Sequence, residues 1–146
     1  NCVIQNNHLF VAEVLGHIKD LPLIISPDEG SNKKIVDLSK YLSNFITFGL
    51  NESIQVIKCD KTRDTSTGIL TGFEVYSKEL LNNRSCLIVD DICDTGETIN
   101  WIEKQLVLNE TKYEIACIFT KKKHKNKIRF HGTVVPDDKW IVFPWE

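Results

Sequence analysis

The chain has 146 residues, of which 42% are apolar, and a formal net charge of −2. This length suits one domain, so we expect residues 1–146 to fold as a single unit. The balanced charge argues against a surface that binds nucleic acid. No apolar run approaches the length of a membrane span, about 20 residues. The five cysteines lack C-x-x-C spacing, which predicts a reducing, cytoplasmic compartment and no zinc site.

The first predicted elements are a helix, a buried strand and a second helix. Residues 8–19 carry apolar side chains at roughly helical spacing. These side chains are Leu9, Val11, Leu15 and Ile18. Residues 23–26 are a short apolar run typical of a buried strand, and residues 33–42 again have a helical pattern. A connection over residues 44–51 is expected to follow.

Residues 27–34 join this strand to the second helix and contain a glycine and two lysines. Backbone N–H groups in such a loop can hold a pyrophosphate group, and a lysine can neutralise its charge. The candidate residues are Asp28, Glu29, Gly30, Ser31 and Lys33. An ordinary strand-to-helix turn with solvated lysines is the alternative, and these residues alone leave it open.

A hairpin is predicted next. Residues 54–59 have the pattern of a strand, and residues 69–75 have the pattern of a strand that returns beside it. The polar stretch between them, residues 60–68, predicts a flexible loop. Lys61 and Arg63 in this loop are candidates to close over a highly charged substrate. A solvated hairpin tip is the alternative.

The most informative stretch is residues 86–99, CLIVDDICDTGETI. Its apolar start predicts a buried parallel strand that ends in two adjacent carboxylates, Asp90 and Asp91. A short loop with a third carboxylate, Asp94, leads into a predicted helix over residues 95–108. Carboxylate oxygens suit Mg²⁺ or ribose hydroxyls, and backbone N–H groups at a helix start suit a phosphate. One loop therefore offers a sugar or metal end and a phosphate end.

The order of apolar strand, Asp-Asp, two residues and Asp-Thr-Gly-x-Thr resembles the signature of type I phosphoribosyltransferases, which bind phosphoribosyl pyrophosphate (PRPP). A Walker B strand or a receiver-domain pocket is the alternative. The chain has no G-x-x-x-x-G-K-[ST] motif, however, and Thr-Gly-x-Thr is not expected in a receiver domain. The resemblance implies an α/β fold of the type I phosphoribosyltransferase kind. The predicted elements comprise four or five core strands separated by three helices, and this alternation indicates a mostly parallel sheet flanked by helices.

The resemblance also implies a role for each residue of the motif. Asp90 and Asp91 would hold the ribose hydroxyls and Mg²⁺, and Asp94 would act as general base toward the purine N7 proton. The 5′-phosphate would be bound by the loop residues Thr95, Gly96, Glu97 and Thr98. Glu97 occupies a position that is usually small in this family, so its carboxylate must point away from a bound phosphate.

The last part of the chain carries a candidate base site. Residues 114–120 predict a strand that leads to Lys121, and the lysines that follow have the pattern of a solvated loop. Together with Trp140 and Ile141, Lys121 resembles the purine site of xanthine-guanine-type phosphoribosyltransferases. The resemblance implies that Lys121 contacts the purine 6-oxo group, Trp140 stacks on the ring and the Ile141 backbone reads its edge. Packing of these side chains in the core is the alternative.

These features support one main hypothesis and two alternatives. In the main hypothesis, a Mg²⁺-dependent enzyme moves ribose 5-phosphate from PRPP to hypoxanthine, guanine or xanthine and releases pyrophosphate. In the second, residues 26–34 resemble the matching loop of ribose-phosphate pyrophosphokinases, which form PRPP. In the third, Glu97 and the acidic first loop mark a non-catalytic module that senses a nucleotide or PRPP. The expected partners are small molecules, with no nucleic acid and no membrane, and relatives of this family commonly form homodimers.

Overall fold

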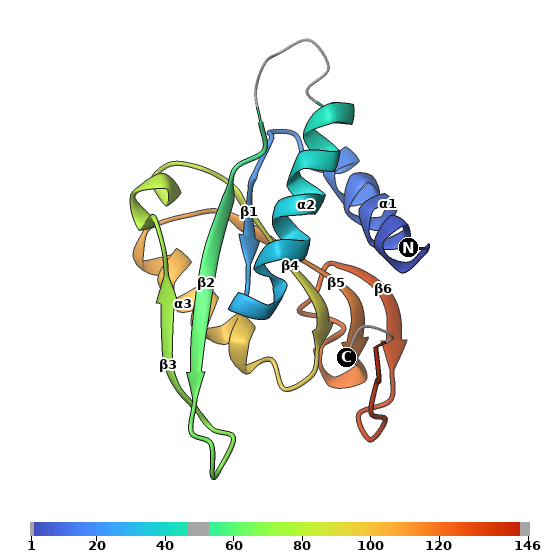
Figure 1. Cartoon of the computed structure of the whole chain (residues 1–146), viewed down its shortest axis with the longest axis vertical. Helices are drawn as coiled ribbons and strands as arrows, with labels where there is room; N and C mark the ends of the chain where they lie inside the picture. Colours follow the sequence, from blue (N-terminus) through green and yellow to red (C-terminus); the bar gives the residue numbers. More distant parts are fainter. Residues whose placement is uncertain (1, 47–52, 144–146) are drawn as a thin grey trace.

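The computed structural model describes residues 2–46 and 53–143. Within them, three helices surround one six-stranded sheet whose strands lie in the order β3-β2-β1-β4-β5-β6 (Figure 1). The strands are β1 (Leu23–Ser26), β2 (Val56–Arg63), β3 (Leu70–Val75), β4 (Cys86–Cys93), β5 (Tyr113–Lys121) and β6 (Phe130–Val135). The helices are α1 (Cys2–Gly16), α2 (Glu29–Ile46) and α3 (Glu97–Leu108), with short 3₁₀ turns η1 (Lys78–Leu81) and η2 (Lys122–His124).

The sheet is parallel except at one edge, where β2 and β3 form an antiparallel hairpin. The arrows of β1, β2, β4, β5 and β6 therefore point the same way in Figure 1. This arrangement confirms the predicted α/β fold with a mostly parallel sheet. The neighbours of β1 are β2 on one side and β4 on the other, so the strand order reverses at β1. Ligands of open α/β sheets bind at the carboxyl ends of the strands beside such a reversal.

Apolar side chains cover both faces of the sheet. On one face, Ile88 packs with Ile99, Ile102 and Leu106 of α3. On the other face, the neighbouring Leu87 packs with side chains of α1 and α2. Successive residues of a strand point to opposite faces, so the apolar run of β4 is buried on both sides. Burying one such side chain contributes about 1.5–3 kcal/mol, and this fixes the strand that carries the acidic motif.

Helix α1 begins before residue 8 and ends before residue 19, which were its predicted bounds. Its buried side chains are Val11, Val14 and Leu15, and Ile18 follows the helix as a partly buried residue. Their spacing of three, one and three residues matches one face of a helix. Leu9 was predicted on this face but is 61% exposed, so that part of the prediction is wrong.

Helix α2 begins at Glu29, four residues before the predicted start at residue 33, because Asp28 and Ser31 cap it. The Ser31 N–H donates to Asp28 Oδ1 at 2.8 Å, and the Asp28 N–H donates to Ser31 Oγ at 3.3 Å. This reciprocal pair satisfies two N–H groups at the helix start. The helix also continues to Ile46, so the expected connection is shorter, and residues 47–51 lie outside the described residues.

The sheet has one strand more than the four or five expected. Strand β6 pairs with β5 from Phe130 to Val135, beyond the basic run. Its residue Gly132 lies so close to β5 that an added Cβ would be 2.7 Å from the Ile118 carbonyl oxygen. Glycine weakens the sequence pattern of a strand, which explains why β6 is not apparent from the sequence. None of the helices described here is long and apolar enough to cross a membrane.

Candidate active site

Three carboxylates gather where the strand order reverses. Asp28 follows β1, while Asp90 and Asp91 belong to β4. Because Ile25 of β1 pairs with Ile88 of β4, Asp90 lies just beyond the end of β1. Burial, together with the charges of Asp91 and Asp28, raises the pKa of Asp90 to about 8. Burial also raises the pKa of Asp91. The unligated site therefore disfavours the ionised forms of both carboxyl groups, and a bound cation would favour them.

Among the ion pairs of the described residues, the one that reaches these three carboxylates is formed by Lys61. Its Nζ lies 2.6 Å from Asp28 Oδ2. Burial acts to raise the pKa of Asp28, but the Lys61 ammonium and the Ser31 hydrogen bonds outweigh it and lower that pKa. Lys61 belongs to β2 and pairs with Phe73 of β3, so the prediction of a flexible loop over residues 60–68 is wrong for its first four residues. A strand, and not a mobile loop, positions this lysine.

The loop between β4 and α3 has the geometry of an anion site. Gly96 has φ 80°, in the left-handed region, and is the N-cap of α3. Its carbonyl oxygen accepts the Asn100 N–H at 2.9 Å, so the helix begins at Glu97 and not at Thr95. The Glu97 N–H donates to Thr95 Oγ1 at 3.3 Å. The first-turn N–H groups of a helix have no partner within the helix and favour an anion, and Thr98 adds a hydroxyl beside them.

Glu97 forms an ion pair across to the hairpin. Its Oε2 lies 3.2 Å from Nη1 of Arg63, at the end of β2. The same Nη1 donates to the Gly68 carbonyl oxygen at 2.9 Å. The Glu97 carboxylate is therefore directed to Arg63 and partly neutralised by it. The contact gives the Glu97 carboxylate a cationic partner in the hairpin.

Lys121, at the end of β5, joins the motif to the last segment of the chain. Only 2% of the residue is exposed. Its Nζ lies 3.7 Å from Asp94 Oδ1 and donates to the carbonyl oxygens of Pro136 and Lys139. Two of the three ammonium donors are used by these carbonyl oxygens, and Asp94 lies within ion-pair distance but beyond a hydrogen bond. Lys121 thus holds the segment that carries Trp140 beside Asp94.

The comparisons with known proteins identify the family of this chain. Residues 16–146 match the model of the phosphoribosyl transferase domain. The chain belongs to this family. A purine phosphoribosyltransferase from Pyrococcus horikoshii has the same fold, with a TM-score of 0.71 and 24% identity over 98% of this chain and 88% of that one.

Two curated relatives of this phosphoribosyltransferase domain match over a shorter region. The hypoxanthine-guanine phosphoribosyltransferase of Aquifex aeolicus is 36% identical over 66 residues, which are 42% of this chain and 36% of the relative. The xanthine-guanine phosphoribosyltransferase of Gluconobacter oxydans is 35% identical over 60 residues, 41% of this chain and 33% of the relative. The match therefore spans about a third of the length of each relative.

Asp90 and Asp91 are the residues of this phosphoribosyltransferase domain that fit Mg²⁺. Their oxygens are of the hard type that Mg²⁺ prefers. Burial first, and then the neighbouring carboxylates, raise the pKa of Asp90, and a bound cation would favour its ionised form. No group of three acidic, histidine or cysteine side chains suited to a metal occurs in residues 2–46 and 53–143. Two carboxylates are sufficient where water and substrate phosphates complete the shell, as is usual for Mg²⁺.

The remaining predicted residues lie at the edges of the site. Trp140 is 75% exposed, so packing in the core does not explain it, and Ile141 is partly buried. Phe143 is buried and meets Phe119 edge-on at 5.8 Å between ring centres. In the first turns of α2, Glu29, Gly30 and Lys33 are exposed, whereas the Asp28 and Ser31 side chains are used in the cap.

A separate cavity lies away from this site. It has a volume of about 420 Å³ between α2 and β2, and Ser39, Lys40 and Lys58 are among its lining residues. No predicted site residue lines it. The acidic motif at the carboxyl ends of the strands, and not this cavity, is therefore the candidate active site.

One neighbour of the loop between β4 and α3 is not singled out by the sequence. His124 of η2 lies against Gly96, so that a Cβ added to Gly96 would be 2.9 Å from His124 Cε1. The two residues are distant in sequence, and His124 stands in a basic run typical of a solvated loop. The fold brings them together because β5 lies beside β4 and η2 follows β5 directly.

Proposed function

We propose that this phosphoribosyltransferase domain transfers ribose 5-phosphate from PRPP to a 6-oxopurine base and releases pyrophosphate. The observation that carries the proposal is the placement of Asp90, Asp91, Asp94 and the left-handed Gly96 along one strand and loop at the reversal of the sheet. The names of the two curated relatives, a hypoxanthine-guanine and a xanthine-guanine transferase, support a 6-oxopurine as acceptor.

Each part of PRPP has a matching group in the site. The loop from Asp94 to Thr98 would take the 5′-phosphate on backbone N–H groups and hydroxyls. Asp90 and Asp91 would take the ribose hydroxyls and Mg²⁺. Mg²⁺, when bound, would neutralise the diphosphate that leaves the sugar. The carboxylates would also stabilise the positive charge that develops on the ribose in the transition state.

The pyrophosphate would compete with Asp28 for Lys61. In the unligated chain Lys61 is paired with Asp28 at 2.6 Å. A diphosphate carries more negative charge than a carboxylate, so it can draw the ammonium away and hold it through charge-assisted hydrogen bonds. Asp28 then serves as an internal anion that keeps Lys61 in the site before substrate arrives.

The base would be held between Lys121 and Trp140. Lys121 donates to two backbone carbonyl oxygens and lies near the Asp94 carboxylate, so the purine 6-oxo group would replace one of the carbonyls as acceptor. Trp140 offers an exposed aromatic surface for stacking. Asp94, held beside Lys121, would accept the N7 proton as the glycosidic bond forms at N9.

The test is a turnover assay with PRPP and Mg²⁺ in which hypoxanthine, guanine, xanthine and adenine are offered separately. The proposal predicts nucleotide formation with at least one 6-oxopurine, little or none with adenine, and a loss of turnover of at least about a hundredfold in Asp94→Asn. Absence of turnover with every base would refute it. The family match and the names of the relatives do not favour a pyrophosphokinase or a sensing module over this function. A homodimer, a cytoplasmic location and a single domain over residues 1–146 stay predictions.

A further inference from the structure

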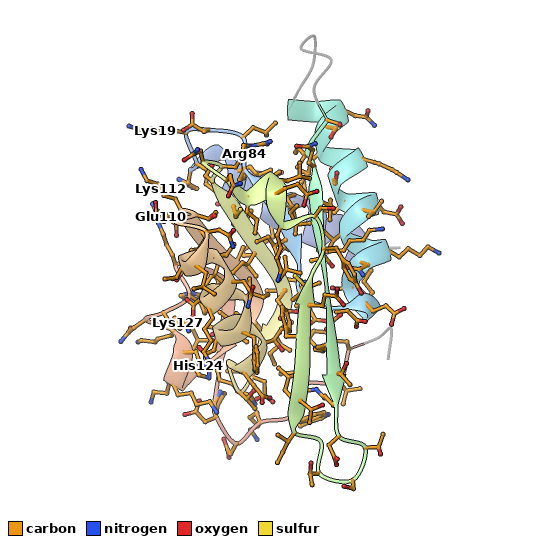
Figure 2. The ribbon with its side chains drawn as sticks, turned by 90° about the vertical axis from the view of Figure 1, so that its left-hand side faces the viewer. Lys19, Arg84, Glu110, Lys112, His124 and Lys127 are labelled. Atoms are coloured by element: carbon orange, nitrogen blue, oxygen red, sulfur yellow. The ribbon has the colours of Figure 1, made fainter. Side chains whose placement is uncertain are left out.

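His124 is held rigidly beside the phosphate loop. Its carbonyl oxygen accepts the N–H groups of Lys127 at 2.9 Å and Ile128 at 3.1 Å, and Ile128 is fully buried. The Lys127 ammonium bonds to Asn100 Oδ1 at 2.6 Å and to Glu103 of α3 at 2.5 Å. Figure 2 labels His124 and Lys127 in this region. These contacts tie the turn that carries His124 to the helix whose start forms the anion site.

The imidazole edge of His124 faces Gly96. A Cβ built on Gly96 would lie 2.9 Å from Cε1 and 3.3 Å from Nε2. The side chain therefore lies directly against the backbone of the residue that caps α3. Only glycine leaves room for it at this position, and the left-handed φ of 80° favours glycine for a second reason.

The Nε2 atom of His124 is buried and has no hydrogen-bond partner among the described residues. A buried nitrogen without a partner is unfavourable by about 1–3 kcal/mol, so native structures rarely keep one without a reason. The acceptor that is absent from the unligated chain would come from a ligand. The nearest ligand position is the anion site formed by residues 94–98.

We propose that His124 is a further phosphate-binding residue, whose Nε2–H donates a hydrogen bond to the phosphate group held by residues 94–98. The inference rests on the proposed function, because it assumes that the 5′-phosphate of PRPP occupies this loop. Either the neutral Nε2–H tautomer or the imidazolium supplies the donor. The bond gives the loop a side-chain donor in addition to its backbone N–H groups and compensates the nitrogen left unpaired in the unligated chain.

The charged side chains around His124 are paired with residues other than His124. In the loop and α3, the Asp94 carboxylate lies beside Lys121 and the Glu97 carboxylate is paired with Arg63. On its own segment, the Lys127 ammonium is used by α3. None of these ion pairs or hydrogen bonds involves His124 Nε2, so a phosphate that contacts this buried atom meets no competing partner among the described residues.

The experiment measures PRPP affinity by calorimetry in the whole chain, together with thermal unfolding without ligand. His124→Phe and His124→Leu keep an apolar side chain against Gly96 but lose the nitrogen, whereas His124→Gln keeps an N–H donor. Lys125→Ala is the matched control, because it removes a neighbouring exposed side chain of the same basic run.

We expect the Phe and Leu variants to bind PRPP about tenfold more weakly, equivalent to about 1.4 kcal/mol. We expect the PRPP affinity of His124→Gln to stay within about threefold of that of the parent chain, and the affinity of Lys125→Ala to be unchanged. The unligated melting temperature should not fall in the Phe variant, because Nε2 makes no bond there. A purely structural role would instead lower it and leave affinity intact.

A second measurement on the unmodified chain keeps the proposal testable if a variant does not fold. In ¹⁵N-histidine-labelled protein, the Nε2 resonance of His124 should shift on addition of PRPP, more than the resonances of His17 and His131. If calorimetry detects PRPP binding by the parent chain, either of two results overturns the inference. One is an unchanged His124 resonance, and the other is an unchanged PRPP affinity in both apolar variants. Absence of any PRPP binding by the parent chain would refute the proposed function as well.

Discussion

Gly96→Ala is the substitution that tests the geometry of the phosphate loop most sharply. The left-handed φ of 80° disfavours any residue with a Cβ, by about 1–2 kcal/mol. The added Cβ would also lie 2.9 Å from His124 Cε1, and overpacking of this kind costs about 1–3 kcal/mol. Together the two effects predict a loss of about 2–5 kcal/mol in the free energy of unfolding.

Urea denaturation of the single and double variants separates the two effects. In the His124→Ala background the steric part is removed, so Gly96→Ala should then cost only about 1–2 kcal/mol. Gly16→Ala is the matched control, because a Cβ there meets nothing within 4 Å. The described contact would be refuted if Gly96→Ala left the free energy of unfolding unchanged. It would also be refuted if the effects of Gly96→Ala and His124→Ala on that free energy were additive within about 0.5 kcal/mol.

Three further substitutions test the charges and the base site. In metal-free buffer Asp90→Asn should stabilise the unligated chain, on the order of several kcal/mol at pH 8, and lose this advantage near pH 4 in thermal unfolding. The reason is that the pKa of Asp90 is about 8 in the folded chain, against 3.8 for an ordinary Asp. The parent chain therefore loses stability as pH rises between these values. Equal stability of both proteins at pH 8 would show that folding does not raise this pKa. Glu97→Gly should change stability by less than about 1 kcal/mol, because its pair with Arg63 is largely solvent-exposed. It should also strengthen PRPP binding severalfold at low salt, and weaker binding by calorimetry would show that the carboxylate has another role. Trp140→Ala should leave the melting temperature almost unchanged but raise the KM for the purine about tenfold or more, as expected from the loss of one stacking partner; an unchanged KM would remove Trp140 from the base site.

The sequence predicted the centre of the fold better than its edges. The apolar runs of β1 and β4 are buried on both faces, so their patterns were unambiguous. Strand β6 is largely exposed and contains Gly132, which sits against the Ile118 backbone. The start of α2 was missed because the cap uses Asp28 and Ser31, a variant of the usual capping box in which serine replaces glutamate.

In the candidate site, the residue types followed from local sequence but their partners did not. The acidic motif carries its strand, loop and helix start within one stretch. The ion pair of Arg63 with Glu97 and the contact of His124 with Gly96 join residues from different strands and turns. Such contacts depend on strand order, which no local pattern specifies. Lys61 was expected in a mobile loop because its stretch is polar, but that stretch continues β2 by pairing with β3.

The most direct test of the account is to follow pyrophosphate and nucleotide together in one reaction with PRPP, Mg²⁺ and a 6-oxopurine. Transfer to the base requires the two products to form in equal amounts, to depend on the base, and to disappear together in Asp94→Asn. Pyrophosphate release without nucleotide, or binding of PRPP with neither product, would contradict the claim that this chain is a purine phosphoribosyltransferase.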